Sequence, residues 1–385
     1  MTNIRVSQLV NKSLLFATIL LLISCVKPVE ENLLKKALSS KNIRIRTVMD
    51  SLEQYELQIR YTQINRKNDS VFFTDFDFQV DINHYFYPAS TVKFPTAVAA
   101  LEKLNELDSI NRHTRFYIEG DTTETTINDA IEEIFAVSDN LANNRLIEFL
   151  GFDALNKRVG KRGITPIRIS HRLSTSNADD ITTKPLVIYT NDSTTITSEA
   201  IFNNIPENIT IPGILKGRGF YENDSLYQEA FDFSLKNYYP IATQHGILKR
   251  IIFPNQFSEK EQFNLSEEQY DFLLNAMSTL PEEAGYDPIE YYDSYGKFFM
   301  YGDSKKPIPN YIKIYNKVGY AYGTLTDCAY IKDTKNNIDF MITATILVNK
   351  NGIFNDDDYE YEQVGIPFLA ELGRELYTLE LKRKR

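Results

Sequence analysis

Ser90 and Lys93 are the first residues whose types and spacing could support a reaction. A serine hydroxyl is a weak nucleophile until a nearby base accepts its proton. Three positions along a helix bring Lys93 back to the same face as Ser90, within reach of its hydroxyl. A lysine can act as that base only where burial or a neighbouring cation lowers its pKa. The pair therefore predicts a serine nucleophile with a lysine base.

The same spacing occurs at Ser294 and Lys297, so the pair is not specific by itself. Ser90 is favoured because Pro88 and an apolar helical pattern over residues 90–107 place it at a helix start. Backbone N–H groups at such a start could stabilise a negatively charged oxygen. The alternative for Ser90 is an ordinary helix N-cap.

Two tripeptides further along the chain could complete such a site. Ser138-Asp139-Asn140 lies between two apolar helical segments, where a hydroxyl could relay a proton and an amide could hold a substrate carbonyl or Lys93. Lys317-Val318-Gly319 follows a predicted strand, and its glycine would let a substrate backbone approach the strand edge. Each tripeptide is common when taken alone. The order of all three motifs, each on the expected element, carries the argument.

The three motifs together resemble the signature of class A β-lactamases and related penicillin-binding proteins, which is Ser-x-x-Lys, Ser-Asp-Asn and Lys-(Thr/Ser)-Gly. The third motif continues from Lys317 to Asp327 in a way that is similar to the class A run of Lys-Thr-Gly, Tyr-Gly-Thr and Asp, with a turn one residue shorter. The resemblance covers residues 40–175 and 240–380.

This resemblance implies a role for each motif residue. Ser90 would be the acylated nucleophile and Lys93 its base or relay. Ser138 and Lys317 would pass a proton to the leaving nitrogen and hold the substrate carboxylate. Asn140 would bind the acylamide side chain, and Gly319 and Tyr320 would bind substrate at the strand edge. The N–H groups of Ser90 and Tyr320 would form the oxyanion hole. Asn177, on the loop after the second motif, would also bind substrate.

Three features depart from the family's pattern. Val318 replaces a hydroxyl-bearing residue, which removes a hydrogen bond to a charged substrate group worth about 1.5–3 kcal/mol. The second and third motifs are far apart, so we expect an insertion over residues 178–240 to remodel one rim of the cleft. Leu173 stands where the family's loop carries the glutamate that activates water for deacylation. General-base catalysis is worth about 10²–10⁴-fold, so we expect β-lactamase turnover to be slow or absent.

The sequence offers two kinds of substitute for that glutamate. Asp179 and Asp180 are the nearest carboxylates, and either would need a refolded loop to reach the site. His171 could act as the base, although a loop histidine that packs for structural reasons is the simpler interpretation.

The order of the predicted elements is typical of an α+β fold. Alternating or continuous apolar runs predict strands over residues 55–64, 71–80, 311–315, 324–331 and 338–348. Helical spacing predicts helices over residues 30–55, 90–107, 128–150, 241–252, 266–277 and 364–381. We therefore expect a five-stranded antiparallel sheet built from both chain ends, with flanking helices and an inserted, mostly helical lobe, as in β-lactamases and transpeptidases.

The N-terminus predicts a lipoprotein signal peptide. An apolar run over residues 14–23 is too short to span a membrane but has the length of a signal-peptide core. It ends at Cys25 in a sequence that resembles the bacterial lipobox, whose cysteine is lipidated. The alternative is an uncleaved membrane anchor. We expect a signal peptide (1–25), a tether (26–40) and a catalytic domain (41–381).

Composition limits the partners. The 385 residues carry a formal net charge of −10, which argues against nucleic acid because phosphate binding needs a basic face. The scattered histidines lack metal-ligand spacing, no motif indicates a cofactor, and Cys328 would have no disulfide partner if Cys25 is lipidated. We expect a monomer in the cell envelope, anchored by lipid on the outer side of the inner membrane or on the outer membrane.

Three functions follow as alternatives. The first is a serine hydrolase that forms an acyl-enzyme with a β-lactam or a related amide. The second is a D,D-peptidase that acts on a peptidoglycan stem peptide. The third is a non-catalytic binding protein of the same fold that uses the insertion over residues 178–240.

Overall fold

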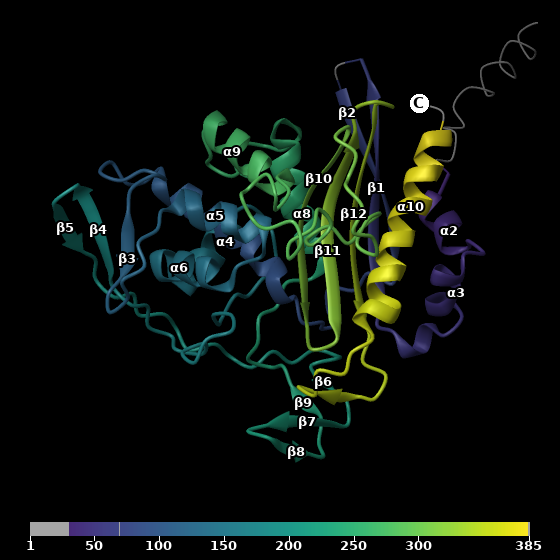
Figure 1. Cartoon of the computed structure of the whole chain (residues 1–385), viewed down its shortest axis with the longest axis horizontal. Coiled ribbons are helices and arrows are strands. Elements are labelled where there is room, and N and C mark those ends of the chain that lie inside the picture. The colour runs from purple at the N-terminus through teal and green to yellow at the C-terminus, as the bar shows by residue number, and fades with distance from the viewer. Residues whose placement is uncertain (1–30, 69, 384–385) are drawn as a thin grey trace, which may run out of the picture. The chain divides into compact units, whose positions relative to one another are not determined.

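Both ends of the described chain contribute to one five-stranded antiparallel sheet (Figure 1). The computed structural model describes residues 31–68 and 70–383, so the predicted signal peptide and Cys25 lie outside the described residues. The strands are, in spatial order, β10 (Ile312–Ala321), β11 (Thr324–Asp333), β12 (Ile338–Leu347), β1 (Gln58–Lys67) and β2 (Ser70–Phe78). The predicted α+β fold and the five-stranded sheet are confirmed.

The burial of each strand follows from its place in the sheet. Helix α10 (Ile366–Lys382) covers one face of the sheet, and α8 (Ile241–Ile252) packs on the other (Figure 1). The inner strands β11 and β12 are therefore buried along nearly their whole length. The edge strand β2 alternates between exposed and half-buried residues. This difference explains why the sequence shows apolar runs in the former and alternation in the latter.

A helical lobe, which we define as α4 to α7, is inserted between β2 and β10. Its helices are α4 (Lys93–Leu104), α5 (Ile127–Ala136), α6 (Asn140–Leu150) and α7 (Phe152–Gly160). Every residue of α4 except Lys103 is buried, as expected for the central helix of a lobe. The 3-10 turn η2 (Ala89–Val92) precedes it, and α9 (Glu267–Ser278) lies between α8 and β10 in the chain. Helix α7 was not predicted.

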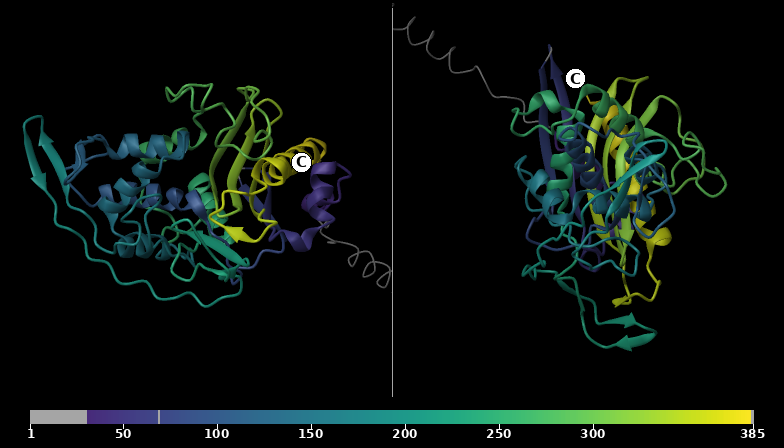
Figure 2. Two further views of the ribbon diagram at one scale, coloured as in Figure 1. Left: turned by 60° about the horizontal axis from the view of Figure 1, so that its bottom comes forward. Right: turned by 90° about the vertical axis from the view of Figure 1, so that its left-hand side faces the viewer.

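The insertion over residues 178–240 forms short strands at two separate places. Strands β4 (Leu186–Asn191) and β5 (Thr194–Thr197) pair with β3 (Phe116–Ile118) beside the helical lobe. The chain then continues to β6 (Leu215–Lys216), β7 (Gly219–Glu222), β8 (Ser225–Tyr227) and β9 (Phe231–Asp232), as Figure 2 shows. Strand β7 pairs with β13 (Ile353–Phe354), which lies between β12 and α10 in the chain.

The tether predicted for residues 26–40 is wrong in its described part. Residues Leu33–Leu38 form helix α2, and Leu34, Ala37 and Leu38 are buried because their spacing gives the helix an apolar face. Helix α3 (Ile43–Met49) follows, and the short turns η1 (Leu52–Gln54), η3 (Pro254–Gln256) and η4 (Tyr361–Gly365) complete the helical elements. No helix in the described part of the chain is long and apolar enough to cross a membrane.

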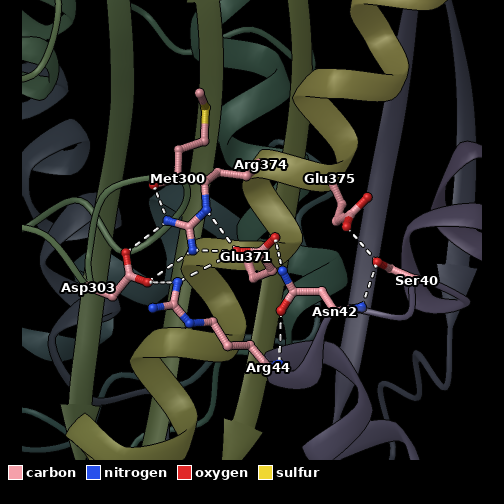
Figure 3. Close-up of polar contacts among 8 residues, drawn as sticks. All are labelled: Ser40, Asn42, Arg44, Met300, Asp303, Glu371, Arg374 and Glu375. Carbon is pink, nitrogen blue, oxygen red and sulfur yellow. Dashed lines mark hydrogen bonds and ion pairs between the residues drawn. The ribbon is translucent and has the colours of Figure 1, made fainter.

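A polar network fastens α3 to α10 and to the turn that contains Asp303 (Figure 3). Arg374 donates to both carboxylate oxygens of Asp303, at 2.8 and 2.9 Å, and to Glu371 at 2.6 Å. Asn42, the N-cap of α3, donates to the other oxygen of Glu371 at 2.7 Å, and Arg44 forms an ion pair with Asp303. The N-terminal helices are thus held to the closing helix by charge-assisted hydrogen bonds.

Candidate active site

Ser90 lies on a cleft of about 530 Å³ that is bounded by several separate segments. Residues that line the cleft include Tyr87, Ser90, Asn140, His171, Ser174, Tyr320 and Tyr322. Lys93, Ser138 and Lys317 are not among the lining residues. The hydroxyl of Ser90 forms no hydrogen bond to any residue that the structure describes. It is therefore open to a substrate that enters the cleft.

Lys93 is fully buried at the start of α4, one turn after Ser90. Its ammonium nitrogen donates to the carbonyl of Ser138, to Asn140 Oδ1 at 2.7 Å and to Ser138 Oγ at 3.2 Å. Burial lowers the pKa of Lys93 to about 7, and the charge of Asp139 opposes this shift. The amine is thus available in its neutral, basic form near pH 7.

Lys317 approaches the same hydroxyl from the sheet. Its nitrogen donates to Ser138 Oγ at 2.8 Å and to the carbonyl of Val318 at 2.9 Å. Burial lowers the pKa of Lys317 well below its ordinary value, and the neighbouring Lys93 lowers it further. Ser138 therefore connects two lysines whose positive charges would repel each other. This arrangement suits a hydroxyl that passes a proton between the two amines.

The backbone around the cleft adopts left-handed conformations at residues other than glycine. The φ angles are +47° at Ala89, +59° at Ser138, +48° at Ser174 and +52° at Tyr322. Such conformations cost free energy and persist where the surrounding structure enforces them, often at functional sites. The turn at Ser138 also divides the helical span predicted over residues 128–150 into α5 and α6, at the point between two apolar segments where the second motif lies. It directs the Ser138 side chain toward both lysines.

Asp139, the middle residue of the second motif, has a structural role that the sequence analysis did not assign. Its carboxylate accepts a hydrogen bond of 2.7 Å from the N–H of Ala142 and so caps α6. The cap holds Ser138 and Asn140 on either side of the helix start. An aspartate directly before an apolar helical run is an N-cap signal that could have identified this role.

The sequence predicts that the third motif follows a strand, but the structure places the motif inside β10. Strand β10 continues to Ala321 because residues 312–321 all pair with β11. A Cβ atom at Gly319 would lie 2.8 Å from the N atom of Ser90 and 2.8 Å from the carbonyl oxygen of Pro88. The glycine therefore permits close contact between β10 and the turn that carries Ser90. The amide of Tyr320, the second group predicted for the oxyanion hole, is next in the strand.

The loop after the second motif places Leu173 and Ser174 in different environments. Leu173 borders the cleft, but its side chain is only 6% exposed and packs within the hydrophobic core. Ser174 turns into the cleft, where its Oγ accepts a hydrogen bond of 3.0 Å from Asn140 Nδ2. Ser174 is thus a contact of the second motif that the sequence analysis missed, since its left-handed backbone has no signal in the sequence.

Asn177, predicted to bind substrate, does not line the cleft. Its Oδ1 accepts a hydrogen bond of 2.7 Å from the Thr175 hydroxyl, and its carbonyl accepts from Arg172 and from the N–H of Asp180. These local contacts hold the Asn177 side chain within the loop, so the structure does not bring Asn177 together with the other predicted site residues.

The second Ser-x-x-Lys match, at Ser294 and Lys297, lies away from the cleft. Ser294 donates to the carbonyl of Ser304, and Lys297 donates to Asn316 Oδ1 at 2.7 Å and to the carbonyls of Met277 and Ile314. Asn316 also donates to Asp327 at 2.8 Å, and burial raises the pKa of Asp327 to about 6. This buried network supports β10 next to Lys317. It explains the aspartate at the end of the third motif.

Aromatic side chains from distant segments form one wall of the cleft. The ring of Tyr87 lies edge-on to Tyr322, with centroids 4.9 Å apart. Behind them, Phe231 and Phe233 of the insertion pack against Tyr322 and against Phe354 of the segment before α10. The insertion itself lines the cleft at residues 178 and 236. This arrangement agrees with the expectation that the insertion lies at a rim of the cleft.

The cleft contains no cluster suited to a metal ion. Within residues 31–68 and 70–383, no group of three or more histidine, cysteine, aspartate or glutamate side chains is arranged to bind one. Cys328 is buried in β11, and burial raises its thiol pKa, so it is an inert core residue. The reactive groups around the cleft are therefore hydroxyls, amines, an imidazole and the carboxylate of Asp357.

A comparison with known families agrees with this geometry. Residues 44–203 match the sequence model of the beta-lactamase enzyme family. This part of the chain is therefore similar in sequence to the β-lactamase family. The match includes the first two motifs and the loop over residues 168–177, and the third motif lies beyond it.

Solved structures of the family share the fold at low sequence identity. A class A beta-lactamase from Bacteroides cellulosilyticus DSM 14838 is 14% identical, with a TM-score of 0.51 over 89% of this chain and 98% of that chain. PBP-A is 14% identical, with a TM-score of 0.51 over 92% and 97% of the two chains. A beta-lactamase from Sphaerobacter thermophilus DSM 20745 is 12% identical, with a TM-score of 0.50 over 91% and 98%. A search of curated protein sequences found no match.

Proposed function

We propose that the protein is a serine hydrolase that forms an acyl-enzyme on Ser90 with a β-lactam or a related amide. The observation that carries this proposal is the buried Lys93, whose lowered pKa of about 7 provides a base one turn from a cleft-facing serine hydroxyl. Lys93 accepts the proton of Ser90 as its oxygen attacks the carbonyl carbon. Ser138 and Lys317 then deliver a proton to the leaving nitrogen.

Substrate binding follows from the groups that face the cleft. Asn140 offers its amide to an acylamide side chain while its Oδ1 holds Lys93. The N–H groups of Ser90 and Tyr320 are the oxyanion hole, and the close approach of Gly319 to Ser90 supports this assignment. Val318 lacks a hydroxyl and is buried, so a substrate carboxylate is bound more weakly than in the family's pattern.

Replacing Ser90 by alanine should abolish the covalent adduct. The protein without residues 1–25 would be mixed with a penicillin and followed by intact-mass spectrometry. The wild type should gain the mass of one penicillin, because the opened lactam stays on Ser90 as an ester. Ser294→Ala is the matched control, since it removes the serine of the second Ser-x-x-Lys match and should leave the adduct intact. An adduct on Ser90→Ala would sink the proposal.

A D,D-peptidase is the second candidate, and one observation favours it. Among the described residues, no glutamate lines the cleft, and the loop position predicted for it is a buried leucine. A peptidase releases D-alanine from a peptide that ends in D-Ala-D-Ala, whereas a β-lactamase opens a lactam without releasing an amino acid. Assaying both products from one preparation distinguishes the two candidates. If neither product and no adduct is found, the result favours the non-catalytic binding protein.

We also propose that Cys25 carries a lipid that anchors the protein to an envelope membrane. This proposal rests on the sequence alone, because Cys25 lies outside the described residues. Wild-type protein expressed in a bacterial host should enter the detergent phase in a Triton X-114 partition, since more than one acyl chain holds it there. Cys25→Ala should move to the aqueous phase. Equal partition of both proteins would contradict the proposal.

A further inference from the structure

Among the residues that the structure describes, His171 carries the only imidazole that lines the cleft, and one of its two ring nitrogens has no hydrogen-bond partner. The side chain is 5% exposed, and it lines the cleft together with Ser90. Its Nδ1 lies 2.6 Å from the carbonyl oxygen of Arg172. Its Nε2 is buried and has no hydrogen-bond partner among the described residues. Buried polar atoms are nearly always satisfied, so an unpartnered nitrogen on a cleft points to a ligand or a water molecule.

The tautomer of His171 follows from this single contact. A carbonyl oxygen only accepts, so Nδ1 must carry the hydrogen and donate to Arg172. In the neutral ring, Nε2 then carries the free lone pair. This buried nitrogen is a proton acceptor on a residue that lines the cleft.

The surroundings of His171 keep it neutral and fix its orientation. Burial lowers its pKa to about 4, and the charged groups around it are Lys236 and Arg168, which lower the pKa, and Asp179, which raises it. Its ring stacks on Tyr87, with centroids 6.1 Å apart and planes inclined by 8°. Its backbone N–H donates to Asn237. A packed histidine needs these contacts, but packing alone does not explain the unpartnered Nε2.

We propose that His171 is the general base that activates water for hydrolysis of the acyl-enzyme, in place of a loop glutamate. This inference rests on the proposed function, because it needs an ester on Ser90. It differs from the interpretation of His171 as a residue that packs only for structural reasons, which the sequence left as the simpler one. Acylation does not involve His171, since Lys93 supplies the base for that step.

The step balances without any other reactant. A water molecule gives one proton to His171 Nε2 as its oxygen bonds to the carbonyl carbon of the ester. The tetrahedral intermediate then breaks its bond to Ser90 Oγ. The proton returns to that oxygen from the imidazolium, through Lys93 or directly, and the product leaves as a carboxylic acid. The histidine and the serine are thereby regenerated.

The basicity of His171 is comparable to that of the group it would replace. An ordinary glutamate has a pKa of about 4.3, and the pKa of His171 is about 4. A base of this strength can accept a proton from water in the transition state when it is correctly placed.

The decisive variant is His171→Asn, because an asparagine amide can still donate to the carbonyl of Arg172 while the Nε2 acceptor is removed. After a short exposure to penicillin and removal of free drug, intact mass would follow the decay of the Ser90 adduct and the appearance of the hydrolysed drug. The adduct should form at the wild-type rate and persist about 10²–10⁴ times longer than in the wild type. His171→Gln provides a second variant if the first does not fold.

The controls separate a failed inference from a failed proposal for the function. His113→Asn removes a histidine that does not line the cleft and should leave both rates unchanged. A structural role for His171 would slow adduct formation and lower the melting temperature, and equal decay in wild type and His171→Asn would also overturn the inference. A wild-type adduct that never decays overturns the inference alone. No adduct and no loss of drug overturns the proposed function as well.

Discussion

The rate of Ser90 acylation should rise about tenfold per pH unit below pH 7 and level off above it. Burial lowers the pKa of Lys93 to about 7, and only the neutral amine can accept the serine proton. Below this pKa, the neutral fraction falls tenfold for each pH unit, and the acylation rate falls with it. Stopped-flow measurement of a chromogenic cephalosporin over about pH 5–9 would record the profile.

Replacing Lys93 by methionine should lower the acylation rate by about 10²–10⁴-fold and remove the rise with pH. Methionine has a similar length but no proton acceptor at its end. Lys103→Met is the matched control, because Lys103 lies on the same helix, donates to the carbonyl of Phe149 and also has a lowered pKa. Lys103 does not line the cleft, so the Lys103→Met variant should be acylated at the wild-type rate. A wild-type profile that still rises beyond pH 9 would show that Lys93 keeps an ordinary lysine pKa.

The lowered pKa of Lys93 also has a cost in stability, and the sign follows from proton binding. The folded protein loses the Lys93 proton near pH 7, whereas the unfolded chain keeps it up to the ordinary value of 10.5. Between these values the unfolded state binds more protons, so the free energy of unfolding rises with pH. Burial of the Lys93 amine therefore lowers the free energy of unfolding at neutral pH, and the same burial gives the amine its lowered pKa.

The fold could be predicted largely from local patterns in the sequence. The apolar runs of β11 and β12 and the alternation of β2 reflect how many faces of each strand are covered. Ser266, followed by Gln269, forms the capping box that starts α9, as its sequence indicates. Some short strands of the insertion could not be predicted, because they pair with partners far away in the chain, as β7 does with β13. The hairpins β4–β5 and β7–β8 are local, and the polar turn residues 192–193 and 223–224 are a signal that the sequence analysis did not use.

The site could be predicted as a set of motifs but not as a geometry. The sequence places Lys93, Ser138 and Lys317 on separate elements, and the structure joins them through one hydroxyl. The left-handed turn at Ser138 joins α5 to α6, which pack against each other. Leu173 is buried in the hydrophobic core. The unused nitrogen of His171 becomes visible only when every neighbour in space is known.

Replacing Arg172 by methionine should lower the free energy of unfolding by about 3–5 kcal/mol. The side chains of Arg172 and Glu148 are 1% and 3% exposed, and they form two hydrogen bonds of 2.6 and 3.0 Å. Arg172 also donates to the carbonyls of Asp180 and Thr182, so it ties both ends of the loop over residues 172–182 to α6. The substitution leaves the charge of Glu148 buried and without its cation, which is the costly part. Urea unfolding of the wild type and the variant gives the difference.

Two comparisons make this expectation specific. The double variant Arg172→Met, Glu148→Leu removes both buried charges and should recover much of the loss, because the pair itself contributes little net stability. Arg115→Met breaks an exposed pair with Glu124, whose side chains are 44% and 41% exposed, and should cost at most about 1 kcal/mol. A loss for Arg172→Met no larger than this would show that solvent reaches Glu148. Because this loop carries Ser174 and directly follows His171, a large loss would mean that the buried ion pair contributes strongly to holding this wall of the cleft in place.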